Sequence, residues 1–457
     1  MPEIGVTGAL GAPVAIVGAG LAGCLLATLL ARRGTEVTVY ERRDDPRVAV
    51  PERGRSINLA ISARGLQALD QVGLREPSLS RALPMHGRMV HGRDGQQSFR
   101  PYSADGTQAI NSISRTELNA ALLDISERTS GVCFRFGHRL RELDMATGQM
   151  TFETAAGQRT ERAGIVLACD GAYSAARRSV TFRQGFTFWQ DYLEHGYKEL
   201  TMPARDGQFA LDPDALHIWP RGSSMMIALP NLDRSFTCTL FWTGEEFAAL
   251  RGAEQVREHF LRDYPDAAGL IPDLAGDYLN NPVGSLATIR CWPWAHHGAG
   301  CALALVGDAA HAIVPFYGQG ANCAFEDCIE IDRCLAETGG SWSAALAAYE
   351  QRRKANCDAI ADMALDNFVE MRDRVNSPVF RAKTAARHAL ERRLPGRYVS
   401  QYELVSFTTM PYAQIPGRMR RQDRATALAV AGLAGAAAAL AGVAAAAAAG
   451  AARRTRR

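Results

Sequence analysis

The sequence lacks an excess of charge of either sign. Its 457 residues include 51 lysines and arginines against 48 aspartates and glutamates, which leaves a formal net charge of +3. Proteins that bind nucleic acid usually carry a concentrated basic surface, and here only the extreme C-terminus is strongly basic. We therefore expect no nucleic-acid partner.

The sequence also lacks the cysteine patterns of zinc sites and of disulfide-rich domains. Its 10 cysteines are scattered from Cys24 to Cys357, with no Cys-x-x-Cys pair and no spacing typical of zinc ligands. A glycine-rich strand begins within the first 20 residues, so no secretory leader is expected. These absences predict reduced thiols, no metal site and a cytoplasmic location.

The most informative motif lies at residues 14–23, which read Val-Ala-Ile-Val-Gly-Ala-Gly-Leu-Ala-Gly. A short apolar strand runs directly into Gly-x-Gly-x-x-Gly and then into an apolar helix over 21–31. In such a motif Gly18 permits a tight turn, Gly20 lets the backbone approach a pyrophosphate, and Gly23 lets the helix pack close to the strand. The helix N-terminus then faces the phosphate charge. The motif predicts a dinucleotide-binding site.

A second strand, over 36–40, leads to Glu41, which lies 18 residues after Gly23. An acid at this distance is placed to bond a ribose hydroxyl, and it favours an adenosine without a 2'-phosphate. The motif alone leaves NAD and FAD both open.

Two further apolar strands end in an aspartate, one in Asp170 and the other in Asp308, and the second is followed by a glycine-rich turn into a helix near 321–335. Because parallel strands end at the same edge of a sheet, we expect the three strand ends to converge on one ligand. An aspartate there can bond the polyol of FAD, and a helix that begins after Gly320 can stabilise a reduced flavin. NAD has no polyol, so FAD is the expected cofactor.

The pattern along the chain predicts an α/β (α+β mixed) fold. Alternating strands and helices at the start are typical of a parallel sheet, and no internal repeat appears. Over 84–102 and 186–286, β-branched and aromatic residues alternate with polar ones, which predicts antiparallel sheet. We expect a Rossmann-like FAD-binding domain over 12–83, 104–182 and 287–345, an antiparallel-sheet substrate domain over 84–103 and 183–286, C-terminal helices over 346–424, and an alanine-rich tail over 425–457.

In this order the motifs resemble the single-component FAD-dependent aromatic hydroxylases with a p-hydroxybenzoate hydroxylase-like fold. Longer strings resemble one family with that fold, the kynurenine 3-monooxygenases, from about residue 13 to residue 415. These strings are the segments 53–65, 87–91, 195–200, 216–220, 228–241, 314–320, 367–371 and 402–407.

The resemblance implies a set of FAD contacts, which fall on Ala22, Tyr40, Glu41, Arg42, Arg43, Ala60, Arg115, Leu140, Ala175, Asp308, Ala321 and Asn322. Family members often have methionine at the position of Ala321 and histidine or phenylalanine at that of Tyr317. We expect Ala321 to contact the flavin through its backbone, and Tyr317 to alter substrate affinity or closure.

The resemblance also implies a pocket for L-kynurenine. The amino-acid head of the substrate would meet Arg88, Tyr102, Asn367 and Tyr402, because a guanidinium can bind a carboxylate bidentately. The apolar wall falls on Leu216, Met225, Leu229, Phe241, Pro315, Phe316 and Met371. Without the resemblance, Arg88 is typical of a solvated charge on a strand, and the tyrosines and methionines are typical of packing.

The implied reaction converts L-kynurenine to 3-hydroxy-L-kynurenine with NADPH and O2 in tryptophan catabolism, through a flavin C4a-hydroperoxide that survives where water is excluded. The substrate's own ring amine activates the carbon beside it, so no strong enzyme acid or base is required. The flavin-side loop with Pro315, Phe316 and Gly320 completes the site. A second Gly-x-Gly-x-x-Gly is lacking, so we expect NADPH to dock transiently. His311 is expected to be a structural histidine bonded to backbone.

Two other functions stay open. The first is hydroxylation of a phenolic acid such as salicylate, which would not require the amino-acid clamp of Arg88, Asn367 and the tyrosines. The second is a non-catalytic flavin-binding protein, which the intact Asp308, Gly320 and Arg88 disfavour.

The tail also leaves two interpretations open. Residues 425–452 contain one threonine and no charge, and arginines lie on both sides. As a helix this segment would span about 42 Å, enough to cross a hydrocarbon core of about 30 Å. Alanine contributes little to membrane insertion, and arginine at both ends gives no orientation. A membrane anchor and a soluble alanine-rich helix are both compatible with the sequence.

Overall fold

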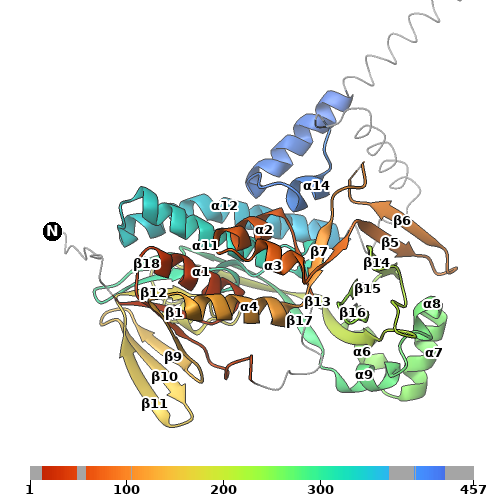
Figure 1. Ribbon diagram of the computed structural model, residues 1–457, viewed down its shortest axis with the longest axis horizontal. Helices are drawn as coiled ribbons and strands as arrows, with labels where there is room; N and C mark the ends of the chain where they lie inside the picture. The colour runs from red at the N-terminus through yellow and green to blue at the C-terminus, as the bar shows by residue number, and fades with distance from the viewer. Residues whose placement is uncertain (1–12, 49–57, 104, 370–395, 397, 428–457) are drawn as a thin grey trace, which may run out of the picture.

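The computed structural model describes residues 13–48, 58–103, 105–369, 396 and 398–427 (Figure 1). Predicted site residue Met371, the segment 50–57 and the tail from 428 onward lie outside the described residues. Among the helices that are described, none is long and apolar enough to cross a membrane.

A six-stranded sheet forms the first layer, and its strands lie in the order β18-β19-β12-β1-β2-β8. Five of the strands are parallel and only β18 runs antiparallel, as the alternating start of the chain predicted. The strands are β1 (Val14–Val17), β2 (Val37–Tyr40), β8 (Val132–Arg135), β12 (Ile165–Ala168), β18 (Ala295–His297) and β19 (Ala302–Leu305). Because β1, β12 and β19 are neighbours, the three predicted strand ends do lie side by side.

Helices cover this sheet and explain why its central strands are buried along their whole length. The helices that contact its strands are α1 (Leu21–Arg32), α4 (Arg115–Arg128) and α12 (Trp342–Val369). Helix α11 (Gly320–Glu337) lies against other helices, and the short helices α5 (Ala175–Arg178) and α10 (Asp308–His311) follow β12 and β19 in the chain. Helix α1 packs against both α4 and α11, and α11 packs against α12.

A seven-stranded sheet forms the second lobe, in the order β17-β13-β16-β15-β14-β5-β6. Its strands are β5 (Gly87–His91), β6 (Gln97–Pro101), β13 (Thr187–Met202), β14 (Ala215–Pro220), β15 (Met225–Pro230), β16 (Phe236–Thr243) and β17 (Gly284–Trp292). The expectation of purely antiparallel pairing is wrong at one place, because β5 pairs with β14 in parallel. Strand β5 comes from an earlier part of the chain and is not joined to β14 by a hairpin, so antiparallel pairing is not imposed.

Four helices interrupt the stretch 186–286 that the pattern predicted as sheet. They are α6 (Gly244–Ala249), α7 (Ala253–Asp263), α8 (Pro265–Ala268) and α9 (Leu274–Asn280). Thr243 and Glu246 form a capping box at the start of α6, and Val256 and Phe260 lie one turn apart on the buried face of α7. These helices bury a separate core with Trp219 and other side chains on one face of the sheet. They lie at the opposite end of the molecule from β18 (Figure 1).

Two small sheets complete the strands. One contains β3 (Leu59–Ile61), β7 (Ile110–Ile113) and β4 (Leu83–Met85), and the other contains β9 (Arg139–Asp144), β10 (Gln149–Thr154) and β11 (Gly157–Arg162). Strand β4 therefore pairs with β7 and not with the seven-stranded sheet. Helices α2 (Ala63–Gln71) and α3 (Arg75–Leu79) follow β3.

A buried arginine fastens the C-terminal segment to the rest of the protein. This segment contains α14 (Gln401–Ser406), the short helix η3 (Tyr412–Gln414) and a helical stretch over 415–427. Arg64 is 1% exposed, donates to the carbonyl oxygens of Thr408 (2.6 Å) and Met410, and stacks on the ring of Tyr412 at 3.8 Å. The Tyr412 hydroxyl in turn donates to Gln319 Oε1 at 2.8 Å. The segment is thus held against the start of α11.

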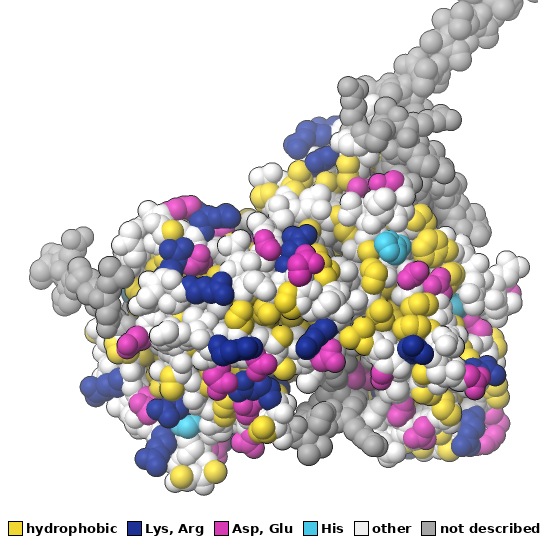
Figure 2. Space-filling model, in the orientation of Figure 1, with side chains coloured by type: hydrophobic (Ala, Val, Ile, Leu, Met, Phe, Trp, Pro, Cys, Tyr) yellow, Lys and Arg dark blue, Asp and Glu magenta, His cyan; other side chains and the backbone are white. Residues whose placement is uncertain are grey.

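Surface charges are mixed and contribute little to the fold. On the face shown in Figure 2, basic and acidic side chains are interspersed. Pairs such as Arg47 with Asp124 (2.9 Å) are partly exposed, and an exposed pair contributes only about 0–1 kcal/mol to stability. The buried contacts around Arg64 and the apolar cores carry more of the stability.

Candidate active site

One cavity of about 290 Å³ is lined by residues from both main sheets and from the C-terminal segment. Its lining contains a large part of the predicted site: Gly20, Ala22, Ala60, Arg88, Arg115, Leu216, Met225, Leu229, Phe241, Asp308, Pro315, Phe316, Gly320, Ala321 and Tyr402. The predicted residues outside the lining are Gly18, Gly23, Tyr40, Glu41, Arg42, Arg43, Tyr102, Leu140, Asp170, Ala175, Asn322 and Asn367.

The glycine-rich turn after β1 is shaped by close backbone contacts. Gly18 has a φ of +104°, a conformation that favours glycine, and its amide donates to the Tyr40 carbonyl at 2.7 Å. A Cβ atom at Gly23 would lie 1.9 Å from the carbonyl oxygen of Gly18, whereas one at Gly20 would have no atom within 4 Å. Gly23 is therefore required by the packing of α1 on β1, while Gly20 leaves open space at the start of α1.

Glu41 braces this turn. Its Oε2 accepts a hydrogen bond from the Ala19 amide at 2.9 Å, and its Oε1 accepts from the amide and the Nε of Arg43 at 3.0 and 2.9 Å. The side chain is buried at the end of β2. Beside it, the Tyr40 ring stacks on Phe152 at 4.4 Å. A bond from Glu41 to the adenosine ribose stays a prediction, and the structure adds a second role that the spacing did not indicate.

The two predicted aspartates differ in their surroundings. Asp308 lines the cavity at the end of β19. Asp170 does not, because its Oδ2 accepts hydrogen bonds from the amides of Ala175 (2.6 Å) and Ala176 (3.1 Å) and so caps α5. Burial raises the pKa of Asp170, and these amide bonds oppose the rise. The motif identified a strand end correctly. Asp170 Oδ2 bonds the local backbone while its buried Oδ1 has no hydrogen-bond partner among the described residues, and a contact from Asp170 to the cofactor stays a prediction.

Asn322 joins three segments beside the cavity. Its Nδ2 donates to the carbonyl oxygens of Ala60 (2.9 Å) and Gly318 (2.8 Å), and its Oδ1 accepts from the Ser62 amide (3.0 Å). The side chain is completely buried. These bonds hold β3 and the turn at Gly318, whose φ is +65°, against the start of α11. Ala60, Gly320 and Ala321 reach the cavity as a result.

The apolar wall comes from one face of the seven-stranded sheet. Alternate residues of β15, Met225, Ile227 and Leu229, line the cavity, while Met226 and Ala228 lie in the core on the other face. Ile227 was missed from sequence, although the two-residue period from Met225 to Leu229 points to it directly. Other lining residues that were missed, including Ile110 and Ile313, carry no such signal because they lie in separate elements.

Arg88 brings a positive charge to this wall. It is the register partner of Leu216 on the neighbouring strand. Its guanidinium lies 4.5 Å from the ring centre of Tyr402 and 5.7 Å from that of Tyr102, distances typical of cation–π contacts. The two tyrosine rings stack at 4.7 Å. Burial raises the pKa of Tyr102, which keeps its phenol neutral beside the cation.

Tyr317 extends the stack of rings, since it lies 5.6 Å from Tyr402 with an angle of 18° between the ring planes. Tyr317 therefore joins the flavin-side loop to the C-terminal segment.

Asn367 holds the flavin-side loop through the backbone of Phe316. Its Nδ2 donates to the Phe316 carbonyl at 2.7 Å. The Phe316 ring packs between Phe368 (4.1 Å) and Phe241 (5.0 Å), so the loop is fixed on both sides. A contact from Asn367 to a substrate head group stays a prediction.

His311 is structural, but the expected backbone partner is wrong. Its Nε2 lies 2.5 Å from the Asp327 carboxylate, and Asp327 also accepts from Arg353 Nε at 2.7 Å. Burial is the largest single effect and lowers the pKa of His311, but the charges of Asp327 and Cys323 and the hydrogen bond to Asp327 together outweigh it and raise the pKa to about 9. His311 and Asp327 lie 16 residues apart on different helices, so no local sequence pattern predicts that they pair.

The residues around the cavity fit FAD. The first amides of α1 and α11 lie at the cavity, and amides at a helix start have no partner within the helix, so they favour negative charge. Arg115 adds a positive charge, Asp308 adds an acceptor for a polyol, and the space at Gly20 is open to a pyrophosphate.

Comparison with known proteins supports FAD as the cofactor. Residues 11–364 match the family model described as FAD binding domain. The chain is 47% identical to kynurenine 3-monooxygenase of Myxococcus xanthus (strain DK1622) over 405 residues, which cover 87% of this chain and 86% of that protein. It is 44% identical to kynurenine 3-monooxygenase of Dictyostelium discoideum over 417 residues, which cover 88% and 89%.

Solved structures of lower identity share the fold. The tetrameric form of 2-methyl-3-hydroxypyridine-5-carboxylic acid oxygenase has a TM-score of 0.65 at 21% identity, and the match covers 83% of this chain and 95% of that chain. PqsL of P. aeruginosa, in complex with 2-aminobenzoylacetate, has a TM-score of 0.64 at 21% identity, with 79% and 97% covered. The predicted fold class and family resemblance are confirmed.

The contrast between Gly23 and Gly20 gives a testable prediction. Gly23→Ala should destabilise the FAD-free protein by about 1–3 kcal/mol, because the new methyl group collides with the Gly18 carbonyl. Gly20→Ala should leave the FAD-free protein within about 0.5 kcal/mol of the parent and weaken FAD binding at least tenfold. Urea unfolding of the FAD-free variants and titration with FAD measure both effects. Unchanged FAD affinity in Gly20→Ala would show that the pyrophosphate does not approach there.

Proposed function

This chain belongs to the kynurenine 3-monooxygenase family, and from that premise we propose that its cavity holds L-kynurenine beside FAD and adds one atom of O2 to the ring, giving 3-hydroxy-L-kynurenine. The observation that carries the proposal is Arg88, a guanidinium at an apolar cavity wall with Tyr102 and Tyr402 against it. An aromatic amino acid requires this combination of a cation for its carboxylate and an apolar surface for its ring.

Several groups would hold FAD. The space at Gly20 and the start of α1 would receive the pyrophosphate, and Asp308 the ribityl chain. The start of α11, with Gly320 and Ala321, would lie at the isoalloxazine. When bound, FAD takes a hydride from NADPH and activates O2 once reduced.

The chain's own residues would bind and orient the substrate and exclude water from it. Arg88 would bind the substrate carboxylate, and the ring of Tyr402 would keep the guanidinium in place. Met225, Leu229 and Phe241 would pack on the substrate ring and keep water from the reacting carbon. Asn367 would act mainly by holding Phe316 at the edge of the pocket. The ring amine of the substrate directs hydroxylation to the neighbouring carbon, so none of these residues has to move a proton.

The activity is tested with purified FAD-loaded protein by following NADPH oxidation. L-kynurenine should accelerate oxidation at least tenfold and yield 3-hydroxy-L-kynurenine, because the amino-acid clamp recognises its head group. Salicylate, which lacks that head group, should not. Acceleration by salicylate alone would favour a phenolic-acid hydroxylase, and no acceleration by either would favour a protein that binds flavin without turnover.

Replacement of Arg88 tests the binding of the carboxylate. Arg88→Met should raise the KM for L-kynurenine about 30-fold or more, because a charge-assisted bond worth roughly 2–3 kcal/mol is lost. The protein should stay yellow, since Arg88 lies on the substrate side. Arg100→Met is the matched control, because Arg100 is the register partner of Arg88 on β6 and does not line the cavity. Loss of FAD from Arg88→Met with Arg100→Met unaffected would place Arg88 at the cofactor instead.

Attachment to a membrane through 425–452 is a separate proposal, supported by the apolar length of that segment alone. Full-length protein should sediment with membranes, and a chain ending at Arg424 should stay in the supernatant. Identical behaviour of the two chains in such a fractionation would contradict an anchor.

A further inference from the structure

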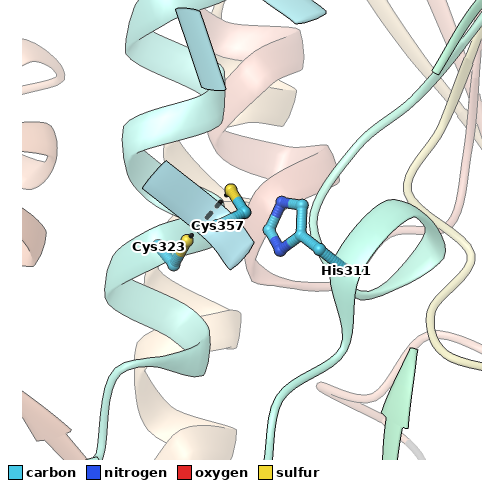
Figure 3. A group of neighbouring side chains, drawn as sticks. All are labelled: His311, Cys323 and Cys357. Carbon is cyan, nitrogen blue, oxygen red and sulfur yellow. Dashed lines mark hydrogen bonds between the residues drawn. The ribbon is translucent and has the colours of Figure 1, made fainter. Parts of the chain in front are cut away.

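A cluster of buried side chains lies beside the cavity and takes no part in the proposed reaction. His311, Cys323 and Cys357 come from α10, α11 and α12, and their nitrogen and sulfur atoms lie within 4.8 Å of one another. Figure 3 shows the imidazole facing the two sulfur atoms. The sulfur atoms are 3.6 Å apart, and both cysteines are completely buried.

Arg353 disfavours a metal cation among these ligands. Its Nη2 lies 3.2 Å from Cys323 Sγ and 3.6 Å from Cys357 Sγ, so the guanidinium points at the sulfur pair. A divalent ion bound by both sulfurs would lie next to this fixed positive charge. The guanidinium is instead a suitable partner for a thiolate.

The charges of the cluster indicate which sulfur is the thiolate. Arg64, Arg353 and protonated His311 are three buried cations, and they face two carboxylates, Asp327 and Glu326. One thiolate would supply the third negative charge that balances these three cations. The hydrogen bond from Cys357 lowers the pKa of Cys323, and the charges of His311 and Arg353 act in the same direction.

Cys357 differs from its neighbour. Burial raises the pKa of the Cys357 thiol, and the bond to Cys323 raises it further. Arg353 Nη2 also lies closer to Cys323 Sγ than to Cys357 Sγ. Both observations make Cys323 the sulfur that favours the thiolate and Cys357 the sulfur that favours the thiol. The thiolate is the nucleophilic form of cysteine, and neighbouring cations such as Arg353 and protonated His311 favour it.

We propose that Cys323 and Cys357 form a peroxide-oxidisable dithiol, a modification site that can join α11 to α12 by a reversible disulfide. Hydrogen peroxide is the oxidant. The Cys323 thiolate attacks one peroxide oxygen, the O–O bond breaks, and the departing hydroxide takes a proton to become water, which leaves a sulfenic acid on Cys323. The Cys357 thiol then attacks that sulfur, the S–O bond breaks and a second water leaves. Two thiols and one peroxide give one disulfide and two waters.

The distance permits this step with a small movement. A disulfide bond is about 2.05 Å long, so the sulfur atoms must approach by roughly 1.5 Å. The other cysteines of α11 lack this arrangement: Cys328 Sγ bonds the carbonyl oxygens of Ala22 and Ala324, and Cys334 Sγ faces Glu330. Among the described residues, Cys133 is the one exposed cysteine. Oxidation of Cys133 therefore shows, in the same sample, that the peroxide has reacted with an accessible thiol.

The test uses FAD-loaded, full-length protein treated with hydrogen peroxide, then alkylated in denaturant, digested and analysed by mass spectrometry. A cross-linked peptide with Cys323 and Cys357, two hydrogens lighter and lost on treatment with dithiothreitol, is expected in the parent chain and in Cys334→Ser. This measurement does not depend on any variant folding. Recovery of both residues as alkylated thiols after Cys133 has been fully oxidised would overturn the proposal, and so would one zinc per chain by elemental analysis.

Two serine variants test the assignment of the thiolate. In Cys357→Ser the serine hydroxyl can still donate to Cys323, but no second sulfur is present, so the sulfenic acid should persist and be trapped by dimedone. Cys323→Ser leaves only the protonated Cys357. At least tenfold more adduct is expected on Cys323 in the first variant than on Cys357 in the second. Equal amounts of adduct on Cys323 and Cys357 would contradict the assignment. The assay contains neither kynurenine nor NADPH, so its outcome does not depend on the proposed activity.

Discussion

The site depends on a single buried amide, the side chain of Asn322. Its three hydrogen bonds hold a strand of the small sheet, the turn at Gly318 and the start of α11 in one arrangement. The fit is tight, because a Cβ atom at Gly65 would lie 2.4 Å from Asn322 Oδ1. A buried amide left without partners costs about 1–3 kcal/mol, so these segments keep their positions together. The position of the flavin side of the cavity follows from that constraint.

The sequence predicted the parts of the site that lie at strand ends or on an alternating strand face. The three converging strands and the alternating wall of β15 were predictable because apolar runs and a two-residue period have a direct structural meaning. The family resemblance supplied Arg88 and Tyr402, which no local pattern assigns to a pocket. Membership of the family, the fold class and FAD were all predicted correctly.

The hydrogen-bond partners of buried polar side chains were not predictable. The bonds of Glu41 to the Ala19 amide, of Asp170 to α5 and of His311 to Asp327 depend on which groups the fold brings within 3 Å, and residue type alone does not fix that. Two features of the second lobe were also missed: the parallel pairing of β5 with β14 and the helices between β16 and β17. An alternating pattern shows which face of a strand is buried, but it does not show which strand lies beside it.

The anchoring of the C-terminal segment by Arg64 has a consequence for how the protein is made. The hydrogen bond from Arg64 to Thr408 joins residues 344 positions apart, and contacts of such long range form late in folding. During synthesis the chain can complete the cradle around α1 and α11 before Tyr402 has left the ribosome. Because Tyr402 lines the cavity together with Gly20 and Ala321, the lining is complete only when the segment that carries Tyr402 has joined the rest of the fold.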